Sequence, residues 1–221
     1  MDNHPCRLYL ISPPSLATDF AAQLEAAFAA GDVAAFQLRL KDADDAHIVA
    51  AIKMLKPICA RHGVAFILND RVDLVEAHGL DGVHLGQDDM PYAQARAALG
   101  EQASIGISCH DSKHLAMEAG EAGADYVAFG AFHATKSKTP DKLARYGTPT
   151  IELLEWWAQN TTVPCVAIGG MTPQNCGPHV AAGVDFIAAI TAVWEHAQGP
   201  GAGVRDFNAA IRAGLKQPTR S

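Results

Sequence analysis

The sequence predicts a protein of the α/β class that folds as a single (β/α)₈ barrel, the TIM barrel. Short apolar runs alternate with longer helical stretches along the 221 residues, and each run is apolar almost throughout. Strands of that kind are buried on both faces, as in a parallel sheet covered by helices. Eight such units can close into a barrel. A doubly wound open sheet is the alternative.

The expected strands span 7–11, 34–38, 65–68, 82–85, 104–107, 126–129, 165–168 and 186–189. A weak internal repeat supports this count. The pattern occurs as Gly79-Leu-Asp-Gly-Val, Gly123-Ala-Asp-Tyr-Val and Gly183-Val-Asp-Phe-Ile. Each copy is typical of a glycine that ends a helix just before a strand begins.

Helices are expected at 19–30, 44–62, 71–78, 90–99, 112–122, 150–160, 173–182 and 205–215. No linker separates them, so residues 1–221 are expected to form one domain. The longest irregular stretch, 131–148, follows the sixth strand, and a loop of this length inside a compact domain is usually functional. We expect it to act as an active-site lid. The glycine-rich segment 198–204 is expected to be flexible before the last helix.

Composition narrows the classes of function. The net charge of −7 argues against nucleic-acid binding, which normally needs a basic surface. No run approaches 18 apolar residues, so a membrane span is not expected. The chain starts without a signal-peptide pattern, and its five scattered cysteines fit reduced thiols, so a cytoplasmic location is expected. The sequence is compatible with a homo-oligomer.

Polar side chains gather where the expected strands end, which is where barrels build active sites. The second strand ends in Gln37-Leu-Arg39-Leu-Lys41, and alternation places its three polar residues on one face. Asn69 and Asp70 follow the third strand, and Asp89 follows the fourth. Ser108 follows the fifth strand and Lys138 lies in the loop after the sixth.

These strand ends predict a magnesium site beside a diphosphate. Asp70 and Asp89 come from adjacent strands and can converge on one Mg²⁺, which takes one or two carboxylates and completes its shell with phosphate oxygens. Basic side chains beside it can neutralise the remaining charge of a diphosphate. Helix capping is the alternative for each aspartate, since Asp70 precedes one expected helix and Asp89 precedes Pro91 of another.

A second anion site is predicted on the far side of the barrel. Gly169 and Gly170 end the seventh strand without side chains, and Ile190-Thr191 opens a helix after the eighth. Barrels often bind a monophosphate between these two loops. The alternative is that the two glycines only form a tight turn.

The ordered motifs resemble the thiamine phosphate synthase family over roughly residues 7 to 195. They are Gln37-x-Arg39-x-Lys41, Asn69-Asp70-Arg71, His84-Leu-Gly-Gln-Asp88-Asp89, Gly106-x-Ser108, Thr135-x-Ser137-Lys138 and Ala167-Ile-Gly-Gly170. The resemblance implies a transferase that joins a hydroxymethylpyrimidine pyrophosphate to a thiazole phosphate with loss of pyrophosphate. It also implies phosphorylated small molecules as partners and Mg²⁺ as cofactor.

The resemblance also implies a role for each matching residue. The pyrimidine pyrophosphate would be bound by Gln37, Arg39, Lys41, Asn69, Ser108 and Lys138. Among these, Arg39, Lys41, Ser108 and Lys138 would act in catalysis. Asp70 and Asp89 would bind Mg²⁺, and the thiazole phosphate would contact Thr135, Ser137, Gly170, Ile190 and Thr191. His84 is interpreted as a packing or supporting residue.

Some positions depart from the family pattern and motivate the second of two further readings. Leu40 replaces a usual glutamate, Ser12-Pro13-Pro14 replaces a short polar loop, and the loop 131–134 lacks its usual prolines. A related family of thiazole tautomerases is one alternative, although it places a catalytic histidine where this chain has Ala131. A non-catalytic phosphate-binding regulatory paralogue is the other.

Overall fold

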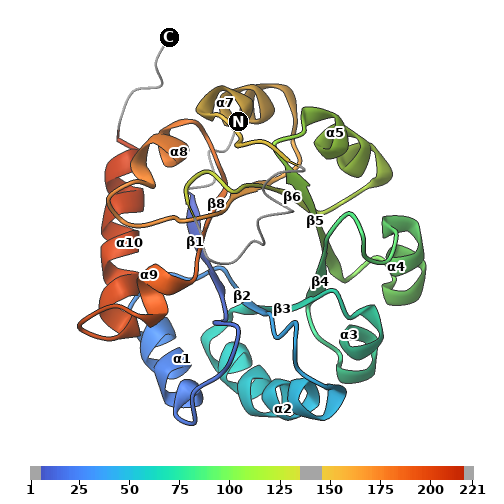
Figure 1. The fold of residues 1–221 in the computed structure, drawn as a ribbon, viewed down its shortest axis with the longest axis vertical. Coiled ribbons are helices and arrows are strands. Elements are labelled where there is room, and N and C mark those ends of the chain that lie inside the picture. The colour runs from blue at the N-terminus through green and yellow to red at the C-terminus, as the bar shows by residue number, and fades with distance from the viewer. Residues whose placement is uncertain (1–5, 135–145, 217–221) are drawn as a thin grey trace.

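The computed structural model describes residues 6–134 and 146–216. In this part of the chain, parallel strands pair in sequence order and close into a barrel, because β1 pairs with β8 as well as with β2 (Figure 1). The strands are β1 Arg7–Ile11, β2 Ala35–Leu38, β3 Ala65–Asn69, β4 Gly82–Leu85, β5 Ser104–His110, β6 Tyr126–Phe129, β7 Cys165–Ala167 and β8 Phe186–Ala189. The predicted TIM barrel is confirmed, and the open sheet is wrong.

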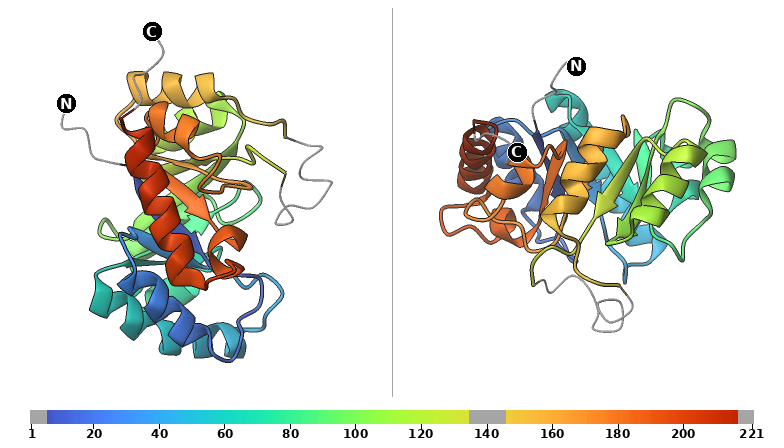
Figure 2. Two further views of the ribbon diagram at one scale, coloured as in Figure 1. Left: turned by 90° about the vertical axis from the view of Figure 1, so that its left-hand side faces the viewer. Right: turned by 90° about the horizontal axis from the view of Figure 1, so that it is seen from above.

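Helices surround this ring of strands (Figures 1 and 2). Their bounds are α1 Phe20–Ala29, α2 Asp45–His62, α3 Val72–His78, α4 Tyr92–Leu99, α5 Lys113–Ala122, α7 Ile151–Asn160, α8 Gly177–Ala181, α9 Thr191–Trp194 and α10 Pro200–Gly214. None of the described helices is both long and apolar enough to cross a membrane.

Each strand divides its side chains between two apolar layers. In β1, Leu8 and Leu10 point outward and pack with the helices, whereas Tyr9 and Ile11 point into the barrel. The inner layer is small and includes Ala35, Ala128 and Ala188, so it leaves space above it. Both layers are buried, which explains why the strands are apolar at successive positions.

The last helix begins earlier than the sequence predicts. Residues 198–204 were expected to be flexible, but α10 starts at Pro200, and proline suits the first turn of a helix. The glycines in this segment permit close packing. A Cβ atom on Gly201 would lie 3.0 Å from the Ala26 oxygen, and one on Gly203 would lie 2.9 Å from Val193 Cα. The absence of side chains therefore lets α10 approach α1 and α9.

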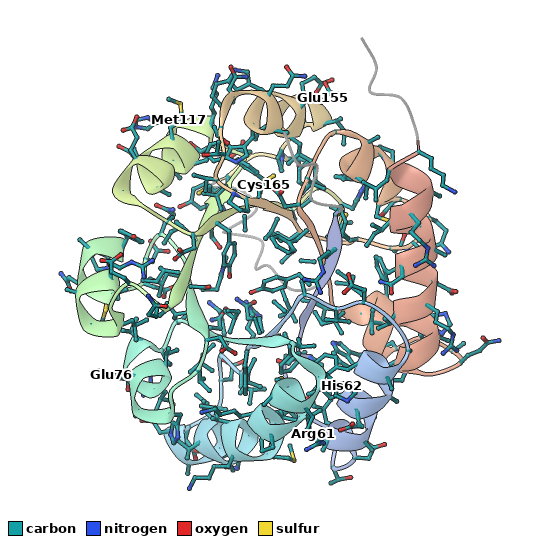
Figure 3. The ribbon with its side chains drawn as sticks, turned by 180° about the vertical axis from the view of Figure 1, so that it is seen from behind. Arg61, His62, Glu76, Met117, Glu155 and Cys165 are labelled. Carbon is teal, nitrogen blue, oxygen red and sulfur yellow. The ribbon has the colours of Figure 1, made fainter. Side chains whose placement is uncertain are left out.

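At the end of the barrel opposite the strand carboxyl ends, two side chains of α2 contact one carboxylate of α1. Figure 3 shows the molecule from behind, with Arg61 and His62 at the end of α2. Arg61 Nη2 and His62 Nε2 each lie 2.6 Å from a carboxylate oxygen of Glu25 in α1. These contacts join two neighbouring helices, and the polar residues of the predicted site lie at the other end.

The predicted lid, 131–148, lies mostly outside the described residues, which stop at Ala134 and resume at Tyr146. Thr135, Ser137 and Lys138 fall in the undescribed part, so their predicted roles stay predictions.

Candidate active site

A cavity of about 600 Å³ opens at the carboxyl ends of the strands. Its floor is the inner apolar layer, and its walls are the loops that follow the strands. All the predicted site residues that the structure describes line it: Gln37, Arg39, Lys41, Asn69, Asp70, Asp89, Ser108, Gly170, Ile190 and Thr191. The strand-end rule thus brings these side chains together, as the sequence predicts.

The end of β2 is held in place by the loop after β1. Ser12 is buried, and its Oγ accepts a 2.9 Å hydrogen bond from the Arg39 backbone N–H. Ser12 N–H in turn donates to the Gln37 carbonyl. This loop departs from the family pattern, yet its serine extends the alignment of β2 and directs Arg39 and Lys41 along the cavity wall. Leu40, a second departure from the family pattern, packs on the outer apolar layer.

Asp70 and Asp89 meet at the rim beside a cation. Lys41 Nζ lies 3.3 Å from Asp70 Oδ2. Burial and a side-chain contact with Asp89 raise the pKa of Asp70, and Lys41 opposes this rise. Asp89 is oriented by the loop after β4, because its Oδ2 accepts a 2.7 Å hydrogen bond from Gly86 N–H. Each carboxylate makes ionisation of the other less favourable, so a shared cation would stabilise the ionised pair.

Helix capping does not explain either aspartate. The N-cap of α3 is Arg71 and that of α4 is Pro91, and neither helix receives a side-chain cap hydrogen bond. Asp70 instead has a left-handed backbone with φ of 65°, which aspartate and asparagine tolerate better than other non-glycine residues. The Asp70 carboxylate contacts Lys41 and Asp89, and it makes no cap hydrogen bond to α3.

The pair fits a hard divalent cation that shares its shell with a phosphorylated ligand. Among the described residues, no cluster of three or more histidine, cysteine or acidic side chains is arranged to hold a metal. A site with two carboxylates suits Mg²⁺, which usually takes few protein ligands and completes its octahedron with water and phosphate oxygens. It does not suit Zn²⁺, which prefers three or four nitrogen or sulfur ligands.

A chain of hydrogen bonds crosses the cavity floor, and sequence reasoning missed most of it. His84 Nε2 lies 2.8 Å from Ser108 Oγ, and His84 Nδ1 lies 3.1 Å from the Tyr126 hydroxyl. That hydroxyl lies 3.0 Å from the Tyr9 hydroxyl. Burial lowers the pKa of His84 to about 4, so the imidazole is neutral at physiological pH. The signal that could have found it is the alternation of strand side chains. Tyr9 lies two positions before Ile11, and Tyr126 two before Ala128, so each tyrosine faces into the barrel with its neighbour.

The far wall carries the predicted second anion site. Gly169 and Gly170 have φ of 105° and 61°, a region that favours glycine. A Cβ atom on Gly169 would overlap Ala131, and one on Gly170 would lie 2.6 Å from the Ala134 oxygen. The tight-turn reading is therefore correct for the backbone, and it does not exclude ligand binding. Ile190 and Thr191 face the same cavity where α9 begins.

Comparison with known proteins agrees with the ordered motifs. A family model described as thiamine monophosphate synthase matches residues 8–193. The chain belongs to this family. Similar members of the thiamine monophosphate synthase family include the thiamine-phosphate synthase of Rhodospirillum centenum, which is 53% identical over 94% of this chain and 98% of its own. That of Erythrobacter litoralis is 52% identical over 86% and 89% of the two chains.

A solved structure of the thiamine monophosphate synthase family shares the whole fold. The thiamine phosphate pyrophosphorylase from Pyrococcus furiosus superposes with a TM-score of 0.81 and is 29% identical, covering 96% of this chain and 98% of its own. The resemblance predicted from the motifs is confirmed.

Proposed function

We infer that this member of the thiamine monophosphate synthase family is a transferase that makes thiamine phosphate. It would join 4-amino-5-hydroxymethyl-2-methylpyrimidine pyrophosphate to 4-methyl-5-(2-phosphoethyl)thiazole. The observation that carries the inference is the contact between Asp70 and Asp89 beside Lys41, in a cavity that this family's motifs line. Such a grouping binds a diphosphate through a cation and through direct positive charge.

In the reaction, the bond between the pyrimidine methylene carbon and the pyrophosphate oxygen breaks. A new bond forms between that carbon and the thiazole ring nitrogen, and pyrophosphate leaves with the electron pair. Arg39 and Lys41 would stabilise the charge that builds on the leaving group, and Ser108 would donate a hydrogen bond to it. Gln37 and Asn69 line the same wall and would orient the pyrimidine pyrophosphate.

The two carboxylates would hold Mg²⁺ against the leaving pyrophosphate. When bound, this ion supplies Lewis-acid charge that lowers the barrier to departure. Lys138 would add a further positive charge from the loop after β6. No side chain needs to act as a nucleophile, which agrees with a cavity floor of apolar groups and neutral hydroxyls.

The thiazole phosphate would occupy the far wall. Gly170, Ile190 and Thr191 line the cavity there, and Thr135 and Ser137 follow Ala134 in the chain. The apolar floor between the two walls, with Val166 and Ala188, would bring the two rings together. We propose small phosphorylated molecules as the partners and a cytoplasmic location. All five cysteines are free and buried, which supports that location.

The tautomerase reading is less consistent with the site. That family places its histidine at the position of Ala131, and His133, the nearest histidine in the sequence, is not among the residues that line the cavity. The His133 ring instead lies 5.3 Å from the ring of His179. The regulatory-paralogue reading does not account for the paired aspartates, because a protein that only binds phosphates does not need a magnesium site.

An assay of purified protein with both substrates distinguishes the three functions. We expect thiamine phosphate and pyrophosphate in equal amounts, with formation that requires both substrates and Mg²⁺. A tautomerase would change the thiazole phosphate without releasing pyrophosphate, and a regulatory paralogue would bind both substrates without turnover. Either of those results would overturn the proposed function.

A further inference from the structure

Each hydrogen bond in the chain on the cavity floor can run in one of two directions, according to which of its two atoms donates. It runs through Tyr9, Tyr126, His84 and Ser108, with oxygen and nitrogen atoms 2.8 to 3.1 Å apart. The members come from β1, β6, β4 and β5, so they link distant parts of the chain. The rings of His84 and Tyr126 stack at 25°, which limits their rotation. We call this chain the floor relay.

A neutral imidazole donates from one ring nitrogen and accepts at the other. Because both neighbours of His84 are hydroxyls, the tautomer of His84 sets the direction of both hydrogen bonds that its imidazole makes. With hydrogen on Nε2, Tyr126 donates to Nδ1 and Nε2–H donates to Ser108. With hydrogen on Nδ1, all these donors and acceptors exchange roles. The two orders differ in which hydroxyl hydrogen has no acceptor within the floor relay.

The surroundings of the two ends favour hydrogen on Nε2. In that order Tyr9 donates to Tyr126, and the unused hydrogen is that of Ser108, a half-buried side chain on the polar wall. In the reverse order the unused hydrogen is that of Tyr9 or of Tyr126, and both side chains are buried. Tyr9 is 4% exposed and packs in the inner apolar layer with Ile11 and Ala188. A hydroxyl hydrogen left without an acceptor there costs free energy.

We propose that Tyr9, Tyr126 and His84 orient Ser108 by hydrogen-bond order, so that its hydroxyl hydrogen points into the cavity as a donor. His84 and Tyr126 are then positioning residues that act through Ser108. An anionic leaving group needs a donor at this point, and a serine turned the other way would present only lone pairs. This functional consequence rests on the proposed function, whereas the hydrogen-bond order itself does not.

The first test is the ¹⁵N NMR spectrum of the imidazole nitrogens in the free protein at neutral pH. The His84 signals are identified by their loss in His84→Gln. We expect a protonated Nε2 and an unprotonated Nδ1. A protonated Nδ1 would overturn the proposal. In Tyr126→Phe, which removes the donor to Nδ1, we expect this tautomer preference to weaken, and an unchanged preference counts against the relay.

The second test is a double-mutant cycle in steady-state turnover. Tyr126→Phe should lower kcat roughly tenfold with little change in KM, as for a donor that matters most when charge develops. In the Ser108→Ala background the same change should have no further effect, because the two residues act in series. Full additivity of the two losses would contradict the relay. Tyr92→Phe is the matched control, since its hydroxyl donates to the Gly123 carbonyl outside the barrel.

A conservative substitution separates positioning from simple packing. His84→Gln keeps an amide N–H that can reach Ser108, whereas His84→Leu fills the space without a donor. We expect glutamine to retain more kcat than leucine, and equal losses would indicate a packing role only. The NMR and turnover results can also disagree. If neither the wild type nor any variant makes thiamine phosphate, while the NMR spectrum shows hydrogen on Nε2 of His84, the proposed function fails and the hydrogen-bond order stands.

Discussion

Asp70 illustrates how a site residue can lower the stability of its own protein. Burial and the neighbouring Asp89 raise its pKa above the ordinary value. Between the ordinary and the raised pKa, the folded protein binds more protons than the unfolded chain. The free energy of unfolding therefore falls as pH rises through this interval and stays lower at neutral pH. A bound cation would stabilise the buried charge of Asp70 and relieve its repulsion with Asp89.

We predict that Asp70→Asn makes the metal-free protein more stable at neutral pH, while turnover falls by about 100-fold or more. Asparagine also accepts the left-handed backbone at this position. Urea unfolding at neutral pH and below the ordinary aspartate pKa measures the gain, which should vanish at the lower pH.

Glu101→Gln provides the matched control, because this exposed side chain lies between α4 and β5 at the other end of the barrel. It changes the net charge equally and should leave turnover unchanged. A loss of stability in Asp70→Asn, with the control unaffected, would argue against repulsion between the aspartates.

Some of the site residues were recognisable in the sequence and others were not. Arg39 and Lys41 alternate with leucine at the end of an apolar run, which places them on one face where barrels build their sites. Tyr9 and Tyr126 are aromatic residues inside apolar runs, which is also the pattern of ordinary core. Only the closed barrel shows that their hydroxyls meet.

At the scale of elements, Gly106 in β5 makes room for a ring from β6. A Cβ atom at this position would overlap the ring of Tyr126. The sequence motif Gly106-x-Ser108 is thus explained by two different needs, space at the glycine and a hydroxyl at the serine.

We predict that Gly106→Ala displaces Tyr126 and lowers the free energy of unfolding by about 1–3 kcal/mol, as for other overpacked cores. Turnover should fall as well, because the contact between Tyr126 and His84 is lost. Gly120→Ala in α5 is the control, since its Cβ atom would lie 3.5 Å from Val163, an ordinary contact. That helical change should be neutral or stabilise by about 0.5–1 kcal/mol. Wild-type stability in Gly106→Ala would contradict the packing argument.

The contact between α8 and the segment after β6 gives the fold a dependence on pH. His179 is buried against the edge of Phe132 and beside His133. Burial lowers its pKa to about 4, below the ordinary histidine value of about 6.5. Between these values the unfolded chain binds the proton and the folded protein does not, so stability falls as pH falls from about 6.5 to about 4.

We predict that His179→Gln reduces this acid dependence of the free energy of unfolding, measured by urea denaturation at several pH values from 7 to 4. The comparison concerns the slope with pH, because a buried glutamine can also lower stability at every pH. His114→Gln controls for the loss of a histidine from an exposed position on α5. A slope for His179→Gln equal to that of the wild type would show that burial of His179 does not drive the effect.

At the scale of the whole molecule, the fold was predictable because eight doubly buried strands have few ways to pack. The strands were found within one or two residues, except that β5 extends to His110 through a register shift against β6. The start of α10 was missed because glycine indicates flexibility in a sequence, whereas here it allows helices to approach. The contact between the two aspartates depends on the pairing of β3 with β4 and on the left-handed backbone at Asp70, and the sequence showed only the first of these.

Isothermal titration of inorganic pyrophosphate into the protein, with and without Mg²⁺, tests the paired aspartates most directly. We expect Mg²⁺ to strengthen pyrophosphate binding to the wild type by about tenfold or more, which corresponds to about 1.4 kcal/mol or more. Asp70→Asn and Asp89→Asn should each abolish this gain, and Glu101→Gln should keep it. Equal pyrophosphate affinity with and without Mg²⁺ in the wild type, or a full Mg²⁺ effect in both aspartate variants, would contradict a shared cation at this site.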